Sequence, residues 1–123
     1  MSLTFTTDLA AVRTLVHRCA REVGLPEARA IDLVLAVSEI AANTLLHAKS
    51  AGMLDIWHDE KEIVCQVQDK GVITDQLAGR RQPSIDAMSG HGLWLVHEVC
   101  DQVEIRSDEN GTTVRLHMFL GAP

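Results

Sequence analysis

One long segment, from Pro26 to Ala48, constrains the fold more than any other part of the sequence. Its apolar residues recur at helical spacing and cover most of the circumference, which predicts a largely buried helix of about six turns. Three polar residues within it, Glu39, Asn43 and His47, are spaced by four and therefore share one stripe. Because polar groups in a buried helix need partners, this stripe is the first candidate for a functional role.

The remaining sequence predicts further helices and strands around this segment. A helix that begins after Asp8 and ends at Gly24 precedes it. The stretch from Asp69 to Ser89 is a loop of about twenty residues, and we treat it as a candidate lid because loops of that length are usually functional or disordered. The other predicted elements are strands at Leu3–Phe5, Met53–His58, Glu62–Val67, Val103–Ile105 and Thr113–Met118, and a short helix opening at Gly90.

This order of elements predicts an α+β two-layer sandwich. We expect a mixed, mainly antiparallel sheet of about five strands, with three helices on one face. A chain of 123 residues is long enough for one hydrophobic core, so residues 1–123 are assigned to a single domain.

The composition argues against several classes of function. A net charge of −6 and an aromatic content of 3% disfavour direct binding of nucleic acid. The chain has no apolar run of membrane-spanning length and does not begin with a signal-peptide pattern. Cys19, Cys65 and Cys100 are an odd, scattered set that implies no disulfide framework, which favours a reducing cytoplasm. They form no metal-binding motif, so we expect core thiols. Trp57 and Trp94 lie where either core packing or contact with a partner is possible, and the core is favoured.

Glu39 and Asn43 lie one helical turn apart and present two oxygens on the same side of the long helix. The Asn43 carboxamide offers one hard, neutral oxygen, which suits a Mg²⁺ ion that takes its other ligands from phosphates and water. The Glu39 carboxylate can orient a water molecule or accept a proton beside such an ion. The alternative is that both side chains simply face solvent at an exposed edge of the helix.

Two glycine-containing segments could complete a nucleotide site. Asp69 and Gly71 end a predicted strand, where a carboxylate can accept a hydrogen bond from an exocyclic amine and a glycine lets a flat ring approach. Gly90-His91-Gly92-Leu93 opens a helix, whose first N–H groups can bind phosphate oxygens. Each segment also has an ordinary explanation, as a strand exit and as a hinge. Gly111-Thr112-Thr113 reads most simply as a turn into the last strand.

In this order, the segments resemble the nucleotide site of the GHKL ATPase superfamily, the Bergerat fold of gyrase and sensor histidine kinases. Ser38 to Ala48 resembles the N box, Asp69-Lys70-Gly71 the first glycine box and Gly90-His91-Gly92-Leu93 the second. Within the superfamily the chain is most similar to bacterial anti-sigma-factor serine/threonine kinases of partner-switching systems. Those proteins tend to carry an Asp after the third helix, as Asp101 does here, and a final Gly-Thr strand like Gly111-Thr112.

Carried over by position, the resemblance implies a role for each matching residue. Asn43 would coordinate Mg²⁺, and Glu39 would be the general base. Asp69 would recognise the adenine amine of ATP, with Gly71 giving the ring room. The backbone at Gly90, His91, Gly92 and Leu93 would hold the phosphates, and Thr112 would support the adenine end of the site.

The resemblance also implies partners and an activity. It predicts a kinase that phosphorylates a serine on an anti-anti-sigma (STAS-type) protein and that sequesters a sigma factor, with no direct contact to nucleic acid or membrane. Members of this family commonly form homodimers. Val72 stands where the first glycine box usually continues with glycine, so a non-catalytic, nucleotide-sensing or purely protein-binding regulatory module is the alternative. The chain also resembles the C-terminal domain of some longer regulators, and a histidine kinase catalytic domain is less favoured.

Overall fold

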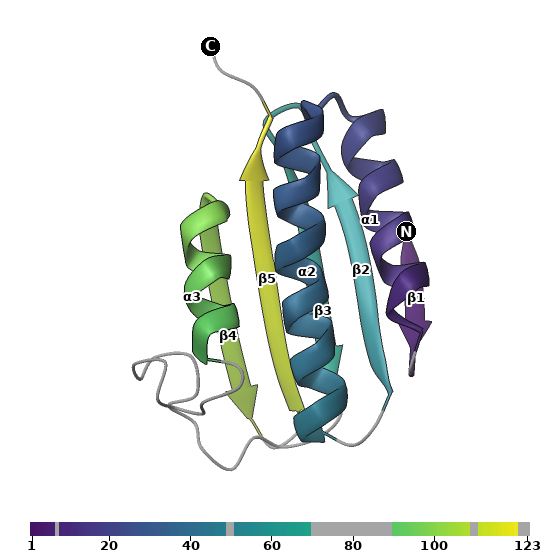
Figure 1. Cartoon of the computed structure of the whole chain (residues 1–123), viewed down its shortest axis with the longest axis vertical. Helices are drawn as coiled ribbons and strands as arrows, with labels where there is room; N and C mark the ends of the chain where they lie inside the picture. The colour runs from purple at the N-terminus through teal and green to yellow at the C-terminus, as the bar shows by residue number, and fades with distance from the viewer. Residues whose placement is uncertain (7, 49–50, 70–89, 109–110, 121–123) are drawn as a thin grey trace.

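The computed structural model describes residues 1–6, 8–48, 51–69, 90–108 and 111–120, and its helices and strands follow the order that the sequence predicts (Figure 1). The predicted candidate lid, apart from Asp69 itself, lies outside the described residues. In chain order the elements are β1 (Ser2–Phe5), α1 (Leu9–Glu22), α2 (Glu27–Ala48), β2 (Gly52–His58), β3 (Glu62–Asp69), α3 (Gly90–Val99), β4 (Gln102–Asp108) and β5 (Gly111–Phe119).

The strands form one five-stranded sheet in the order β1-β2-β3-β5-β4. All four pairings between the described strands are antiparallel, so the predicted mixed character of the sheet is wrong. The reason is that the connection from β3 to β5 passes through α3 and β4, which places β5 antiparallel to both of its neighbours. The helices α1, α2 and α3 lie on one face of the sheet, as predicted, with α2 over its centre (Figure 1).

Alternating residues of the strands pack against the helices and form the core. Leu54 of β2, Ile63 of β3 and Leu116 of β5 are fully buried on the face that the helices cover. Helix α2 contributes Leu33 and α1 contributes Val16, both with no exposed surface. Burial of each such side chain stabilises the fold by about 1.5–3 kcal/mol, so this layer of contacts fixes α2 above β3 and β5.

Local signals set the ends of α1. The Asp8 carboxylate accepts a hydrogen bond from the backbone N–H of Ala11 at 3.2 Å, which satisfies one of the free donors in the first turn. At the other end Gly24 adopts φ +99°, a conformation that favours glycine, and the Leu25 N–H donates to the Ala20 carbonyl at 3.0 Å. These contacts confirm the predicted beginning and end of this helix.

The predicted burial of α2 is correct for one side only. Ile31 and Leu35 are 46% and 47% exposed, and Leu46 lies on the same outward stripe. The helix is apolar around most of its circumference, but among the described elements it packs against α1, α3 and the sheet, and none of these covers its outward side. Trp57 and Trp94 are also exposed, at 42% and 59%, so the expectation that both belong to the core is wrong.

Within the described residues, no helix combines the length and apolar character needed to cross a membrane.

Candidate functional site

Asp69 and Thr112 meet where β3 ends and β5 begins. The backbone N–H of Thr112 donates a hydrogen bond to Oδ1 of Asp69 at 3.4 Å, although the two residues are far apart in the sequence. Only 8% of Asp69 and 5% of Thr112 is exposed. Gly111, which adopts φ +130°, lets the chain enter β5 directly beside them. The structure therefore places two of the predicted site residues together, at one end of the central strands.

Burial of the Asp69 carboxylate is the unusual feature at this end of the sheet. A buried carboxylate loses solvation and persists only where other groups donate hydrogen bonds to it. Asp69 pairs with Gly52 across β2 and β3, so its backbone belongs to the sheet while its side chain lies on the side that faces the helices. In that position, the Asp69 carboxylate can accept a hydrogen bond from a group that lies between the sheet and the helices.

Glu39 and Asn43 lie on the flank of α2 that faces α3. At about 3.6 residues per turn, Glu39 and Asn43 lie on the same side of the helix as Arg29 and Asp32. Arg29 identifies that side, because its guanidinium donates to the Asp101 carboxylate directly after α3 at 2.8 Å. Both Glu39 and Asn43 are half-buried, so the alternative that they face solvent at the edge of the helix stays open. Their predicted roles stay predictions.

The other predicted site residues lie at or beyond the limits of the described part. Helix α3 begins at Gly90, so Gly90, His91, Gly92 and Leu93 form its first turn. The N–H groups of a first turn have no partner inside the helix and are available to an anion. The position of Gly71 lies outside the described residues, and the same holds for the side chains of His47, His91 and Leu93.

The donor set determines how a divalent cation could bind here. Among the residues that the structure describes, no three His, Cys, Asp or Glu side chains gather closely enough to hold a metal. A Mg²⁺ ion near Asn43 would therefore take most of its ligands from phosphate oxygens and water, as Mg²⁺ does in nucleotide sites. The residues present fit a cation that is bound together with a polyphosphate. The prediction that Asn43 contributes one ligand to Mg²⁺ does not need a separate metal site made of protein side chains.

Sequence comparison decides the family. The sequence profile of the histidine kinase-like ATPase domain matches residues 4–118. The chain belongs to this family. The match includes all three helices, the strands from Thr4 to Met118 and every segment that resembles a GHKL motif, so the predicted relationship to GHKL ATPases is confirmed. A comparison with curated protein sequences found no match.

Several solved structures share this fold. The structure of the SiaB–SiaC complex from Pseudomonas aeruginosa matches with a TM-score of 0.68 at 12% identity, over 94% of this chain and 88% of that chain. The RsbU and RsbW domains of Rv1364c from Mycobacterium tuberculosis match with a TM-score of 0.67 at 20% identity. That match covers 100% of this chain but 33% of the mycobacterial chain, so our sequence spans about a third of its length.

A third similar structure comes from a sensor protein. The histidine kinase domain of the blue-light activated histidine kinase EL346 from Erythrobacter litoralis matches with a TM-score of 0.62 at 18% identity. It covers 91% of this chain and 61% of that chain. At these identities the three likenesses establish the shared fold of the ATPase domain.

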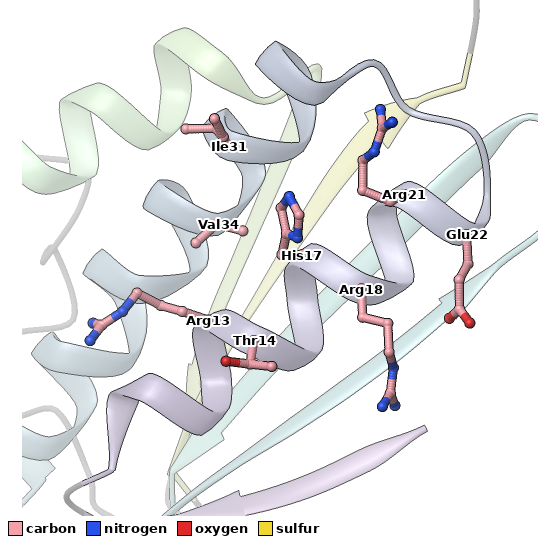
Figure 2. Close-up of a pocket in the computed structure, with 8 residues that line it drawn as sticks. All are labelled: Arg13, Thr14, His17, Arg18, Arg21, Glu22, Ile31 and Val34. Atoms are coloured by element: carbon pink, nitrogen blue, oxygen red, sulfur yellow. The ribbon is translucent and has the colours of Figure 1, made fainter.

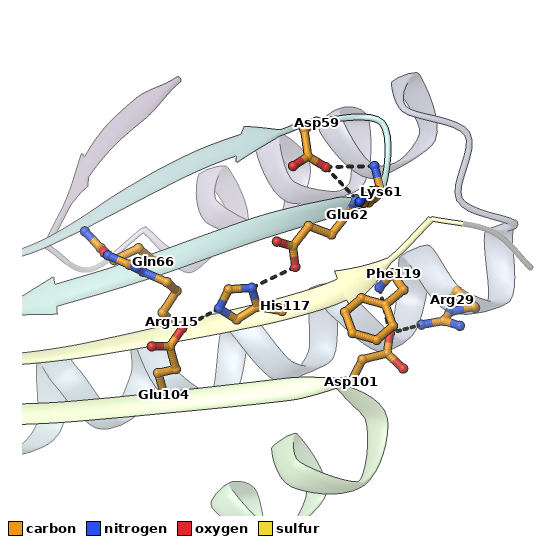
Figure 3. A network of polar contacts seen from close by, with 10 residues as sticks. All are labelled: Arg29, Asp59, Lys61, Glu62, Gln66, Asp101, Glu104, Arg115, His117 and Phe119. Atoms are coloured by element: carbon orange, nitrogen blue, oxygen red, sulfur yellow. Dashed lines mark hydrogen bonds and ion pairs between the residues drawn. The ribbon is translucent and has the colours of Figure 1, made fainter.

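Asp101 has a structural role that the sequence did not reveal. Its Oδ2 accepts hydrogen bonds from the Arg29 guanidinium at 2.8 Å and from the backbone N–H of Phe119 at 2.6 Å (Figure 3). Its own N–H donates to the His117 carbonyl at 2.9 Å. One carboxylate thus joins the end of α3 to the first turn of α2 and to the end of β5. It holds α3 in place on this ATPase domain.

The face of the sheet opposite the helices carries a second polar group that sequence reasoning missed. The imidazole of His117 lies between two carboxylates, with Nδ1 at 2.8 Å from Glu62 and Nε2 at 2.6 Å from Glu104 (Figure 3). The hydrogen bond from His117 lowers the pKa of Glu104, with smaller contributions from nearby positive charges. Strand alternation was the available signal, because it places all three residues on the same face.

Arg115 completes this face of the sheet. Its guanidinium donates to the Gln66 side chain at 2.7 and 3.1 Å and lies 5.3 Å from the ring centroid of Trp57. A cation held over an indole ring is attracted to it and covers one side of the ring. This contact explains why Trp57 is ordered on the open face although it lies outside the core.

The prediction that the cysteines are core thiols is confirmed for two of the three. Cys65 and Cys100 are buried, and Cys19 is half-buried. Desolvation by burial is the main cause that raises the pKa of Cys65, and it raises the pKa of Cys100 to about 12. Because the thiolate is the reactive form, these two thiols are unreactive at neutral pH and serve in packing.

Proposed function

We propose that this ATPase domain binds ATP with Mg²⁺ and acts as an anti-sigma regulatory factor. In this proposal it phosphorylates a serine on an anti-anti-sigma (STAS-type) protein and, in its other state, sequesters a sigma factor. The family, the ordered GHKL motifs and the similarity to an RsbW domain and to the SiaB–SiaC complex support it. The proposal places the protein in the cytoplasm, without direct contact to nucleic acid or membrane, and allows a homodimer.

The observation that carries the nucleotide proposal is the buried Asp69 carboxylate. It lies at the end of β3, on the helix side of the sheet, and the N–H of Thr112 already donates to one of its oxygens. The exocyclic amine of adenine donates hydrogen bonds and a carboxylate accepts them, so the two groups are chemically complementary. A carboxylate so positioned favours adenine over guanine, because guanine carries a carbonyl oxygen at the same ring position.

Asn43 and Glu39 supply the groups for the phosphate end. The Asn43 carboxamide oxygen would hold the cation that accompanies the phosphates, and the N–H groups at Gly90 to Leu93 would bind phosphate oxygens. ATP, as the substrate, would supply the γ-phosphoryl group to the serine hydroxyl, with its bond to the β-phosphate oxygen broken and ADP as the leaving group. Glu39 would accept the hydroxyl proton on its carboxylate as the serine oxygen attacks, which is the task of a general base in phosphoryl transfer.

A second candidate function is a non-catalytic regulatory module. Val72 follows the first glycine box where the family usually has a second glycine, and a β-branched residue restricts the backbone where glycine would not. Under this alternative the domain binds its protein partner in the absence of phosphoryl transfer.

Two substitutions on α2 separate these functions. We expect Asn43→Ala to abolish Mg²⁺-dependent binding of a fluorescent ATP analogue, and we expect Glu39→Ala to retain that binding. With a candidate STAS-type protein and radiolabelled ATP, the parent should phosphorylate a serine and Glu39→Ala should not. Stable complex formation without any phosphorylation, unchanged in Asn43→Ala, would instead support the non-catalytic module.

A further inference from the structure

An open groove runs between α1 and α2 on the side of the helix layer away from the sheet. All of its lining residues belong to these two helices, and its volume is about 810 Å³ (Figure 2). A trough with two helical walls and no roof does not enclose a small molecule, but it offers the shape that a third helix needs. The groove lies apart from Asp69 and from the first turn of α3.

The base of the groove is apolar and remains uncovered. Ile31 and Val34 line it, and the exposed side chain of Leu35 extends the apolar surface along α2. Ile31 and Leu35 are one turn apart and are each nearly half exposed, whereas Leu33 on the opposite side of the same helix is fully buried. An apolar stripe at helical spacing on the outside of a domain typically marks a contact with another protein.

The α1 wall of the groove is basic. Arg13, His17 and Arg21 are spaced by four, and Figure 2 shows their side chains pointing from α1 toward α2. The Arg13 guanidinium donates to the neutral hydroxyl of Ser38 at 3.3 Å. Glu27 is shared between His17 at 2.9 Å and Arg21 at 3.5 Å. Arg21 also donates to the Leu25 carbonyl at 2.8 Å. Arg18 and Glu22 of α1 complete the charged lining. With Glu27 beside it, this wall brings three guanidinium groups together with two carboxylates, so it is positive on a chain of net charge −6.

The shape, the apolar base and the positive wall of the groove together indicate what kind of molecule binds there. We propose that the groove between α1 and α2 binds an amphipathic helix of a partner protein, which places apolar side chains on Ile31, Val34 and Leu35 and carboxylates beside Arg13 and Arg21. The Arg13 guanidinium carries several N–H donors, and its bond to Ser38 uses one of them, so the same group can also donate to a carboxylate oxygen.

The charge and the apolar base also distinguish this occupant from a polyanion. A nucleic acid gains its affinity from a broad basic surface and from stacking on aromatic side chains. This groove offers a row of three basic residues and an aliphatic base. A helix that combines leucine-like residues on one side with glutamates on its flank matches both features at once.

The test uses labelled synthetic peptides that form amphipathic helices of about four turns. One peptide carries leucines along one side and glutamates on the flanks, and a second carries lysines at the glutamate positions. In fluorescence anisotropy without nucleotide, the parent should bind the acidic peptide at least about tenfold more tightly than the basic one. Arg13→Glu should reverse this preference, and Ile31→Ser should weaken both peptides by about tenfold or more.

Matched controls show whether the effects belong to the groove. Arg106→Glu changes an exposed charge on β4, and Trp94→Ser removes an exposed apolar side chain from α3, so both should leave peptide binding unchanged. Circular dichroism confirms that every variant is folded. Because ATP binding is assayed separately, failure of this proposal does not affect the nucleotide proposal.

Three outcomes would overturn the proposal. The first is equal affinity for the acidic and basic peptides, or no effect of Arg13→Glu and Ile31→Ser on the binding of either. The second is a dimer, seen by sedimentation, that Ile31→Ser dissociates, since the groove would then bind a second copy of the chain. The third is binding of duplex DNA that Arg13→Glu abolishes while the acidic peptide does not bind.

Discussion

Replacing Asp101 by alanine removes a carboxylate that joins three elements of the ATPase domain. The charge-assisted hydrogen bond from the Phe119 N–H, 2.6 Å long, contributes about 1.5–3 kcal/mol in comparable cases. The ion pair with Arg29 adds about 0.2–1 kcal/mol, and the lower end applies because the two side chains are 30% and 40% exposed. Phe119 lies at the surface, where water can replace the lost acceptor. We therefore expect Asp101→Ala to lower the free energy of unfolding by about 2 kcal/mol.

Urea denaturation followed by circular dichroism measures this loss. For a chain of this length the change corresponds to a decrease in Tm of about 8 °C, with an unchanged m value. Asp101→Asn keeps one acceptor oxygen and should lose about half as much stability. Glu98→Ala removes an exposed carboxylate from α3 as a matched control and should have little effect. A loss below about 0.5 kcal/mol for Asp101→Ala would refute the argument that this carboxylate holds α3 in place.

Three further predictions concern stability. Leu33→Ala should lower the free energy of unfolding by about 2–5 kcal/mol in urea denaturation, whereas Leu35→Ala on the exposed side of the same helix should cost less than about 1 kcal/mol. Gly24→Ala should lower the free energy of unfolding by about 1 kcal/mol in the same assay, because alanine is strained at a φ of +99°. No atom lies within 4 Å of the new Cβ, so no steric clash adds to this loss. A gain in stability would contradict this prediction. The bond from His117 lowers the pKa of Glu104 from its usual 4.5, so the stability it contributes is present above about pH 4.5 and lost as the pH falls through the lowered folded value. Urea midpoints measured across that range should therefore depend less steeply on pH in Glu104→Gln, and an unchanged slope would exclude this role.

Local signals in the sequence were sufficient for most of the fold. Asp8 and Gly24 mark the two ends of α1, and both act there as predicted. The alternation in β2 and β3 predicted a hairpin, and its turn is closed by Asp59, whose carboxylate accepts from the N–H groups of Lys61 and Glu62. These features depend on neighbouring residues alone, which is why a single sequence reveals them.

Features that depend on distant residues were less predictable. The apolar circumference of α2 predicted a largely buried helix, but Ile31 and Leu35 are exposed because, in the part of the chain that the structure describes, no element covers the outward side. The same limit applies to Trp57, whose contact with Arg115 joins strands that are far apart in the sequence. Periodicity identifies which residues share a face, but it does not reveal whether anything packs against that face.

In the candidate site, too, the sequence identified residues but did not reveal the contacts that depend on packing. The resemblance placed Asp69 and Thr112 in one site, and the structure brings them into direct contact at 3.4 Å. Asp101 was recognised as a feature of the family, but its contacts with Arg29 and Phe119 required the folded chain. A motif names the residues of a site, whereas the partners that hold each one follow from packing.

Calorimetric titration of the domain with ATP and Mg²⁺ tests the central claim most directly. We predict saturable binding of ATP at micromolar to millimolar concentrations, weaker binding of GTP, and loss of the ATP preference in Asp69→Asn, since a carboxamide can offer a donor where the carboxylate only accepts. Asp55→Asn changes an acidic residue on the opposite face of the sheet and should bind ATP like the parent. The absence of measurable heat with ATP and Mg²⁺ at millimolar concentration would contradict the claim that this domain is a nucleotide-binding member of its family.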